Sequence, residues 1–151
     1  YRGGIQNTGI KSYLETPSII AIRGHGFNPA RQGKVLLTNR TLFGRDRHTC
    51  AYCGEHYQGA NHLSRDHILP RSRGGEDTWM NVVTACRHCN GMKRNRTPEE
   101  SGLELLYAPY VPNKAEYLIL SNRRILSDQM EFLKPHLSAH SRIRDISATA
   151  P

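Results

Sequence analysis

The four cysteines constrain this chain more than any other feature of its sequence. They form two pairs, Cys50–Cys53 and Cys86–Cys89, each with two residues between its members, and 32 residues separate the pairs. A two-residue gap lets both thiolates of a pair reach one ion, and two pairs complete the tetrahedral coordination of a structural Zn²⁺. The alternatives are two disulfides in an exported protein or a redox pair, but disulfides within a CxxC pair are strained and a redox motif needs no duplicate. The spacing therefore predicts one zinc site built from all four cysteines.

Such a zinc would hold segments of the chain together and would do no chemistry, because four thiolates leave no open coordination position. We expect it to clamp the loop that contains Cys50 to the start of a helix near Cys86. The cysteines alone therefore fit a binding module as well as an enzyme.

The charge of the chain is uneven along its length. The 151 residues include 21 Lys and Arg and 13 Asp and Glu, a formal net charge of +8. Residues 1–39 contribute +4, residues 40–96 contribute +5 and residues 97–151 contribute −1. Sixteen of the 21 basic residues are Arg, whose planar guanidinium matches phosphate oxygens. A polyanion is the expected partner of the first two-thirds of the chain, although Arg that merely solvates the surface is an equal alternative at this charge.

Length and hydropathy limit the architecture. A chain of this length favours one domain. No apolar run approaches the ~18 residues that a spanning helix needs, so we expect no membrane partner. The first residue is Tyr1 rather than Met, so we expect a fragment or a processed chain.

Local patterns predict short elements up to the second cysteine pair. Residues 1–37 are typical of short strands and loops, with Ser18–Ile22 and Val35–Leu37 as strand candidates. Thr38 and Asn39 predict a capped helix that extends to Arg47. A strand, a loop, a second strand and a short helix should follow: Asn61–Leu69, Arg71–Thr78, Asn81–Ala85 and Arg87–Arg94.

After residue 96 the sequence is typical of helices. Thr97–Glu100 and Asn113–Glu116 each have the pattern of a capping box, and the second predicts a helix to Lys134 that Pro135 ends. The apolar positions of that helix would share one face: Leu118, Ile119, Leu126, Met130 and Leu133. Such a stripe is ordinarily core, with the seam of a homodimer as the alternative.

Three stretches near the cysteines carry a more specific pattern: Arg65–Gly75 (RDHILPRSRGG), Trp79–Val83 (WMNVV) and Cys86–Lys93 (CRHCNGMK). In this order and spacing they resemble the HNH endonuclease family, and more narrowly its branch with a four-cysteine zinc site. The resemblance covers Cys50 to about Pro98, roughly a third of the chain. It implies an α+β fold with a ββα-metal, treble-clef-like core around a structural zinc, flanked by N-terminal short strands and C-terminal helices.

The resemblance also implies roles for four polar residues. Asp66 matches the family's first metal ligand, His67 its general base, and Asn81 the residue that braces the loop and His67. Asn90 matches the third position, a metal ligand that is His or Asn in the family. Asp and Asn oxygens suit Mg²⁺ or Mn²⁺ rather than a soft metal. The implied reaction is in-line attack on a DNA phosphodiester by a water that His67 activates, leaving a 5′-phosphate and a 3′-hydroxyl.

Basic side chains near these positions are candidates to bind backbone phosphates: Arg71, Arg73, Arg87, Lys93, Arg94 and Arg96. Such contacts position a strand without reading its sequence. The helix that begins near Arg87 would add the dipole of its N-terminus. Solvated loop charge is the alternative for each of these residues.

The predicted organisation has four segments: strands and loops in residues 1–37, a zinc-containing nuclease core in 38–96, helices in 97–134, and a tail in 135–151 whose flexibility stays open. The predicted function is a metal-dependent HNH endonuclease that acts on DNA in the cytoplasm of a bacterium, or as a phage-encoded protein. It would hold a structural Zn²⁺ and a catalytic Mg²⁺ or Mn²⁺. The alternatives are a zinc-stabilised nucleic-acid-binding module without catalysis and, less well supported, a zinc adaptor for a protein partner. A mere binder has no need of the four polar residues together.

Overall fold

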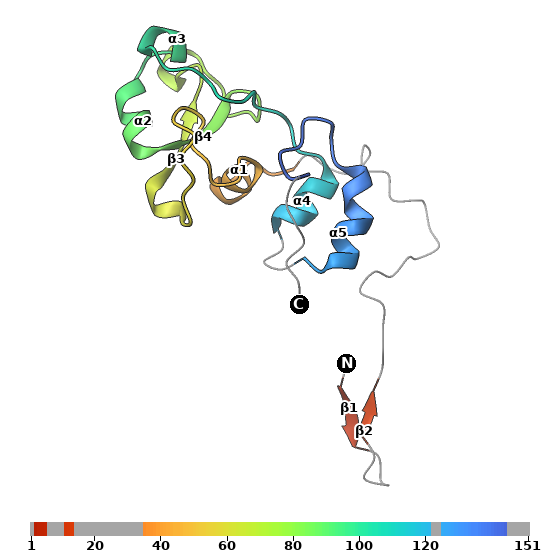
Figure 1. Cartoon of the computed structure of the whole chain (residues 1–151). Coiled ribbons are helices and arrows are strands. Elements are labelled where there is room, and N and C mark those ends of the chain that lie inside the picture. The colour runs from red at the N-terminus through yellow and green to blue at the C-terminus, as the bar shows by residue number, and fades with distance from the viewer. Residues whose placement is uncertain (1, 6–10, 14–34, 122–124, 145–151) are drawn as a thin grey trace.

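The computed structural model describes residues 2–5, 11–13, 35–121 and 125–144. Two short strands, β1 (Arg2–Ile5) and β2 (Lys11–Tyr13), pair antiparallel, in keeping with the short N-terminal strands that the sequence predicts. A second two-stranded sheet and several short helices make up the part from residue 35 onward (Figure 1). The fold therefore mixes helices with small antiparallel sheets, as an α+β class requires.

Two antiparallel strands followed at once by a helix occupy the middle of the chain. A 3-10 helix, η1 (Ala60–His62), leads into β3 (Leu63–His67), which pairs with β4 (Val82–Cys86). The connecting loop contains the 3-10 helix η2 (Arg71–Arg73), and α2 (Arg87–Lys93) begins directly after β4. In this register His67 lies opposite Val82. The predicted strand, loop, strand and helix are confirmed, with ends moved by one or two residues.

The side chains of β4 belong to two apolar clusters, because neighbouring residues of a strand face opposite sides of a sheet. Val82 packs with Leu42 and Phe43 of α1 (Asn39–Arg45), whereas Val83 and Ala85 pack with the cysteines. Both α1 and α2 contact both strands. Burial on both faces fixes the register of the strand pair. The positions of Asp66 and His67 at the end of β3 are therefore fixed by a well-packed sheet.

A buried arginine joins α1 to this sheet. Arg45 is 0% exposed and lies beside the rings of Trp79 and Tyr110, with its guanidinium carbon 5.4 and 5.6 Å from their centroids. All five of its N–H groups donate hydrogen bonds. The acceptors are both carboxylate oxygens of Asp46 and the backbone carbonyls of Trp79, Val82 and Tyr110. The guanidinium is thus fully paired inside the core, which is the condition under which a buried charge is tolerated.

The predicted capping boxes are present. Thr97 and Glu100 form one at the start of α3 (Pro98–Ser101), and Asn113 and Glu116 form the other at the start of α4 (Lys114–Ser121). The predicted cap at Thr38 also forms a box, with Thr41. In the box of α3 the Glu100 carboxylate accepts from the Thr97 backbone N–H at 2.9 Å. Reciprocal side-chain bonds of this kind satisfy the free N–H groups of a first turn, so each box marks a helix start.

The single helix predicted for Asn113–Lys134 is wrong. The chain forms α4 (Lys114–Ser121) and α5 (Ser127–Leu133), followed by the 3-10 helix η3 (Lys134–His136). Leu126 has an extended backbone with φ −72° and ψ 156°, and its side chain is 46% exposed, so it does not continue an apolar face. The buried Ile125 turns the chain into the core before a new helix begins at Ser127.

The core of this helical part includes more residues than the predicted apolar face. The buried members of the cluster come from both helices and from the segment after them: Ala115, Ile119, Ile125, Met130, Leu133, Leu137 and Ile143. Part of the predicted tail therefore packs in the core. No helix in the described part of the chain is long and apolar enough to cross a membrane.

Of the two strand candidates before residue 38, Val35–Leu37 is wrong. This segment has no regular secondary structure. Val35 and Leu37 instead pack against the cluster of α1, and the Val35 carbonyl accepts from the Trp79 indole N–H at 3.0 Å. The apolar alternation here reflects packing against a helix without a neighbouring strand. The other candidate, Ser18–Ile22, lies outside the described residues.

Candidate active site and metal centre

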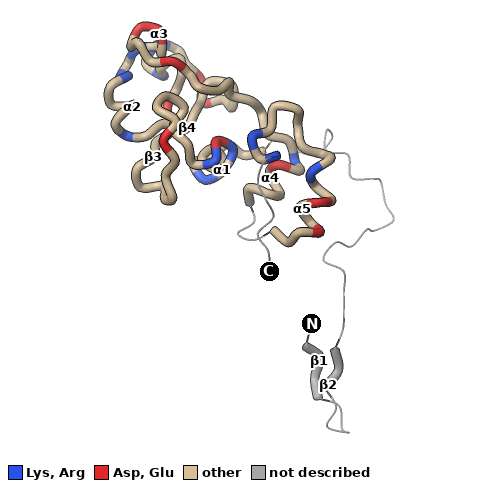
Figure 2. The backbone as a smooth tube through the Cα atoms, viewed as in Figure 1, with Lys and Arg blue, Asp and Glu red and all other residues tan. Residues whose placement is uncertain are grey.

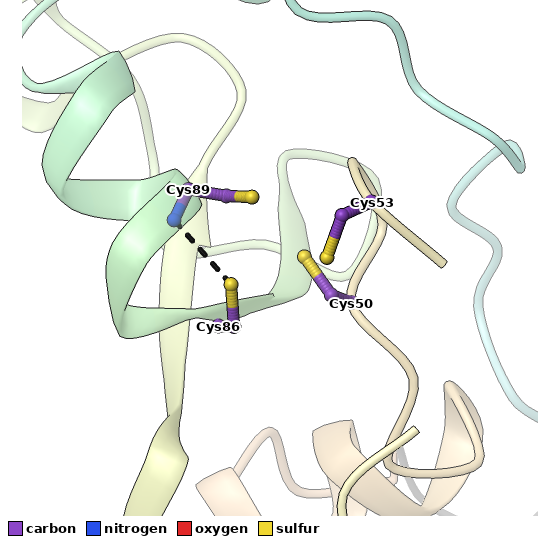
Figure 3. Close-up of side chains that lie close together, drawn as sticks. All are labelled: Cys50, Cys53, Cys86 and Cys89. Atoms are coloured by element: carbon purple, nitrogen blue, oxygen red, sulfur yellow. Dashed lines mark hydrogen bonds between the residues drawn. The ribbon is translucent and has the colours of Figure 1, made fainter. Parts of the chain in front are cut away.

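The four cysteines converge on one point (Figure 3). Cys50 and Cys53 lie in the loop after α1, Cys86 ends β4, and Cys89 lies in the first turn of α2. Their sulfurs all lie within 4.8 Å of one another, and all four thiols are free. Tetrahedral coordination at Zn–S distances of about 2.3 Å needs sulfurs this close together. The cluster is therefore compatible with a metal ion such as zinc.

The chemistry of these thiols also fits a cation. Burial raises the pKa of the Cys53 and Cys89 thiols. Burial alone would also raise that of Cys86, but hydrogen bonds, the first from the Cys89 backbone N–H, outweigh it and lower the pKa of Cys86 to about 7. Four neighbouring thiolates repel one another unless a positive ion lies between them, so a bound cation is what would let all four ionise together.

The cysteine loop is tied to the rest of the site through its backbone. The Ala51 N–H donates to the Thr84 carbonyl of β4 at 2.8 Å, and the Leu106 N–H donates to the Ala51 carbonyl at 2.8 Å. Tyr52, between the two cysteines, is buried and points its hydroxyl at Asp66 of β3. A metal at the cluster would thus stiffen one wall of whatever site Asp66 belongs to.

A polar pocket of about 470 Å³ lies where the end of β3 meets α2. It brings together three of the four polar residues that the resemblance singles out, namely Asp66, His67 and Asn90. Asn81 is not part of the lining. The full lining is Arg65, Asp66, His67, Pro70, Arg71, Ser72, Asn90, Lys93, Arg94 and Asn95.

Asp66 is the buried carboxylate of this pocket, with 4% of its surface exposed. The Tyr52 hydroxyl donates to its Oδ2 at 2.5 Å, and the Lys93 ammonium donates to its Oδ1 at 3.0 Å. Burial and the bond to Asp66 raise the pKa of Tyr52 far above that of a free tyrosine, so Tyr52 remains a donor. Each carboxylate oxygen keeps one lone pair for another partner.

Lys93 lies in an unexpected place for a phosphate-binding residue. The residue is buried, and its ammonium donates to the backbone carbonyl of His67 at 2.7 Å as well as to Asp66. The charge of Lys93 therefore compensates that of Asp66 inside the pocket wall. Contact with a phosphate on the surface would require Lys93 to leave this pair.

His67 has a hydrogen-bond partner in the loop between β3 and β4. Its Nε2 lies 2.9 Å from Oδ1 of Asp77, and Oδ2 of Asp77 lies 2.5 Å from a guanidinium nitrogen of Arg65. Burial alone would raise the pKa of Asp77, but the hydrogen bonds from Arg65 and His67 outweigh it and lower that pKa. Asp77 is thus an anion at neutral pH, held between two donors.

Asn81 braces the loop between the strands. Its Oδ1 accepts from the Leu69 backbone N–H at 2.9 Å, and its Nδ2 donates to the carbonyls of Leu69 and Glu76 at 3.1 and 2.8 Å. The loop is tight here, because a Cβ on Gly75 would lie 1.8 Å from the Leu69 carbonyl oxygen. Asn81 and Gly75 together fix the path of the chain just after His67.

Asn90 lines the pocket and has one amide atom without a hydrogen-bond partner among the described residues. Its Nδ2 donates to the Ser64 hydroxyl at 2.9 Å, and among the described residues no donor is bonded to its Oδ1. Because the amide nitrogen is fixed by Ser64, the carbonyl oxygen has a defined orientation. An oxygen of this kind suits a hard divalent cation.

The predicted phosphate-binding residues differ in their exposure and in their hydrogen-bond partners. Arg71 and Arg94 line the pocket and are exposed. Arg73 forms an ion pair with Glu100 of α3, and Figure 2 shows acidic positions on α3 close to the basic positions of α2. Arg87 and Arg96 are exposed. Arg87 donates to the backbone carbonyl of Asn61, and Arg96 donates to those of Met92 and Lys93.

The sequence pattern did not indicate two residues of this site, Tyr52 and Asp77, nor the inward direction of Lys93. Tyr52 is signalled only weakly, as the aromatic residue inside the first cysteine pair. Asp77 lies in a Gly- and Asp-containing loop whose composition is typical of any turn. Neither pattern states which side chain the residue meets, so the geometry was needed to identify them.

Comparison with known proteins gives one family. The family model described as HNH endonuclease matches residues 50–106, a little over a third of the chain. The matched stretch begins at the first cysteine of the cluster and includes β3, β4, α2 and α3. No curated protein matches the chain significantly. Residues 50–106 are thus similar to HNH endonucleases, and a match to a family of nucleases points to a nucleic acid as the substrate.

Proposed function

We propose that this protein is a metal-dependent endonuclease that hydrolyses phosphodiester bonds of DNA, with a ββα-metal core formed by β3, β4 and α2. The observation that carries the proposal is the pocket in which Asp66, His67 and Asn90 meet beside exposed Arg71 and Arg94. The pocket is open to solvent at a strand end, so an extended backbone could reach it. The choice of DNA over RNA rests on the resemblance of the sequence to the family.

Two kinds of metal site fit the residues present. The four cysteines would hold a structural Zn²⁺, since their sulfurs have the number, type and spacing that zinc prefers. Asp66 and Asn90 would hold Mg²⁺ or Mn²⁺ through a carboxylate and an amide oxygen, and a site with few protein ligands is usual for Mg²⁺. When bound there, a divalent ion supplies a Lewis acid that neutralises charge on the scissile phosphate.

His67 would act as the general base. A neutral imidazole takes a proton from a water molecule, and that water attacks phosphorus in line with the departing 3′ oxygen. The expected products carry a 5′-phosphate and a 3′-hydroxyl. Asn81 would keep His67 in place by bracing the loop that follows it, because its side chain closes three hydrogen bonds across that loop.

Arg71 and Arg94 are the best-placed candidates for phosphate contacts, since both line the pocket and are exposed. Arg73, Arg87 and Arg96 would contact the backbone further out, where their present partners exchange with phosphate at little cost because exposed pairs contribute at most about 1 kcal/mol. Lys93 would act on Asp66 rather than on a phosphate.

Incubation of the full chain with supercoiled plasmid tests this function. With Mg²⁺ or Mn²⁺ we expect conversion to nicked or linear DNA, and none with a chelator present. Labelling of the ends should find a 5′-phosphate and a 3′-hydroxyl. Cleavage that persists after the divalent ion is removed, or no cleavage of any DNA form, would contradict the proposal.

A zinc-stabilised nucleic-acid-binding module without catalysis remains the second candidate, and one observation favours it. The buried ammonium of Lys93 donates to one oxygen of Asp66, and its positive charge lowers the affinity of Asp66 for a divalent cation. The two candidates differ in one direct measurement. An endonuclease binds Mn²⁺ at a site lost in Asp66→Asn, whereas a binder retains DNA affinity with no such Mn²⁺ site.

A further inference from the structure

The carboxylate of Asp77 is fixed at both of its oxygens. Oδ1 lies 2.9 Å from Nε2 of His67, and Oδ2 lies 2.5 Å from Arg65. Arg65 is itself anchored, since its Nε donates to the Asn39 side chain at 3.1 Å. A carboxylate bound at both oxygens cannot rotate away from the imidazole without breaking a charge-assisted bond.

This contact decides which nitrogen of His67 carries the proton. An ionised carboxylate only accepts hydrogen bonds, so the nitrogen that faces it must be the N–H. In a neutral imidazole one nitrogen is a donor and the other an acceptor. With the proton on Nε2, the lone pair lies on Nδ1, and among the described residues no protein donor is bonded to Nδ1.

The two residues also differ in their relation to the pocket. His67 is part of its lining, whereas Asp77 is not and is 43% exposed. Asp77 therefore meets His67 from outside the pocket, and it holds the ring without competing for the space where a water and a phosphate would lie.

We infer that Asp77 is the positioning residue of His67, fixing the neutral imidazole in the form protonated at Nε2 so that Nδ1 is the atom that accepts a proton from water. The consequence of this inference for cleavage rests on the proposed function. After proton transfer the imidazolium carries a positive charge, and the Asp77 carboxylate stabilises it. The proton ends on Nδ1, and the hydroxide forms the bond to phosphorus. The P–O3′ bond breaks, and the 3′ oxygen leaves with its electron pair and takes a proton from solvent to become the 3′-hydroxyl.

The alternative role of Asp77 is an ordinary loop ion pair with Arg65. Such a pair would leave the imidazole free to exchange its two neutral forms. The distinguishing quantity is therefore the protonation of each ring nitrogen, which a structural role in the loop would not change.

The variant Asp77→Asn tests the inference, because a carboxamide keeps the shape but can face the ring with either its oxygen or its NH₂ group. Glu76→Gln is the matched control, since it removes one carboxylate from the same loop at an exposed position. Asp77→Glu is the conservative rescue. Zinc content and thermal midpoint establish that each protein is folded.

The first readout needs no substrate. Long-range ¹H–¹⁵N spectra of histidine-labelled protein, recorded at a pH above which the His67 signals no longer change, report the proton position on His67. We expect the Nε2–H form in the parent, in Glu76→Gln and in Asp77→Glu, and a mixture in Asp77→Asn. The same Nε2–H signals in Asp77→Asn, or a parent that is protonated at Nδ1, would overturn the inference.

The second readout is cleavage of a short duplex with Mn²⁺. Loss of a group that orients a catalytic residue typically costs about 10- to 100-fold, so we expect kcat of Asp77→Asn to fall by that factor with KM for DNA and Mn²⁺ affinity unchanged. A kcat equal to that of Glu76→Gln would overturn the inference. A parent that cleaves no DNA overturns the proposed function alone, while the spectra still decide whether Asp77 orients His67.

Discussion

At the scale of single residues, the pair of Asp66 and Lys93 is the feature that most affects how the pocket would bind a cation. Both side chains are buried, and the ammonium lies 3.0 Å from the carboxylate. A buried carboxylate needs a positive partner, because desolvation of an unpaired charge is costly. In the absence of a divalent ion, the Lys93 ammonium compensates the charge of Asp66. A bound ion would compensate part of that charge together with Lys93.

The variant Lys93→Met tests this sharing. Without added metal we expect its free energy of unfolding to fall by about 3 kcal/mol, because Asp66 loses its buried partner. Mn²⁺ should then stabilise the variant more than it stabilises the parent, since the ion replaces the missing charge. Thermal unfolding with and without Mn²⁺ measures both effects, with Lys134→Met as the exposed control. Equal Mn²⁺ shifts in parent and variant would show that the ion does not meet Asp66.

The residue types of the site could be predicted from the sequence, whereas the direction of their side chains could not. Asp66, His67 and Asn90 follow from the motif and do line one pocket. Lys93 is part of the same motif, yet a lysine three residues after Asn90 reads equally well as a surface charge or a buried partner. Only the packing of α2 against β3 selects between these two.

At the scale of elements, a glycine in the loop between β3 and β4 and a glycine in α2 differ in the space around them. A Cβ on Gly75 would lie 1.8 Å from the Leu69 carbonyl oxygen, which is backbone and cannot move aside cheaply. A Cβ on Gly91, within α2, would meet nothing within 4 Å. The first glycine is required by a close approach, and the second is not.

We therefore expect Gly75→Ala to lower the free energy of unfolding by about 3 kcal/mol and to reduce cleavage, because the loop braced by Asn81 must open. Gly91→Ala should raise it by about 0.5–1 kcal/mol, since alanine favours a helix over glycine. Denaturant unfolding of the two variants beside the parent gives both values. A neutral Gly75→Ala would show that the loop has another path available.

Helix starts could be predicted well and helix continuity could not. Thr97 and Glu100 form the expected box, because capping is a local interaction between residues three apart. The long helix failed for the opposite reason. Leu118, Ile119, Leu126, Met130 and Leu133 have helical spacing, but the burial of Ile125 in the core breaks the helix before Ser127. Burial of that residue is a tertiary effect that periodicity does not contain.

At the scale of the whole molecule, two sets of contacts connect β4 and α2 to the segments before and after them. The cysteine cluster joins the loop after α1 to α2, and Arg45 joins α1 to β4 and to the segment at Tyr110. Arg45 had no signal in the sequence, because a buried guanidinium and a solvated one look alike there. The segment limits 1–37, 38–96, 97–134 and 135–151 remain predictions.

Removal of zinc tests the first of these two sets of contacts. Metal analysis should find one tightly held zinc per chain, and a strong chelator should lower the thermal midpoint and abolish cleavage. Added Zn²⁺ should restore both, whereas Mg²⁺ alone should not, because thiolates select zinc over hard cations. Absence of zinc, or two disulfides by mass, would contradict the site.

The central claim is that His67 activates water for hydrolysis of a phosphodiester, and the rate of plasmid nicking by His67→Ala tests it most directly. General base catalysis contributes about 10²- to 10⁴-fold, so the variant should nick supercoiled plasmid with Mg²⁺ or Mn²⁺ at least about 100-fold more slowly than the parent. His140→Ala, an exposed histidine outside the pocket, should match the parent. Equal nicking by His67→Ala with its zinc content unchanged would contradict the account.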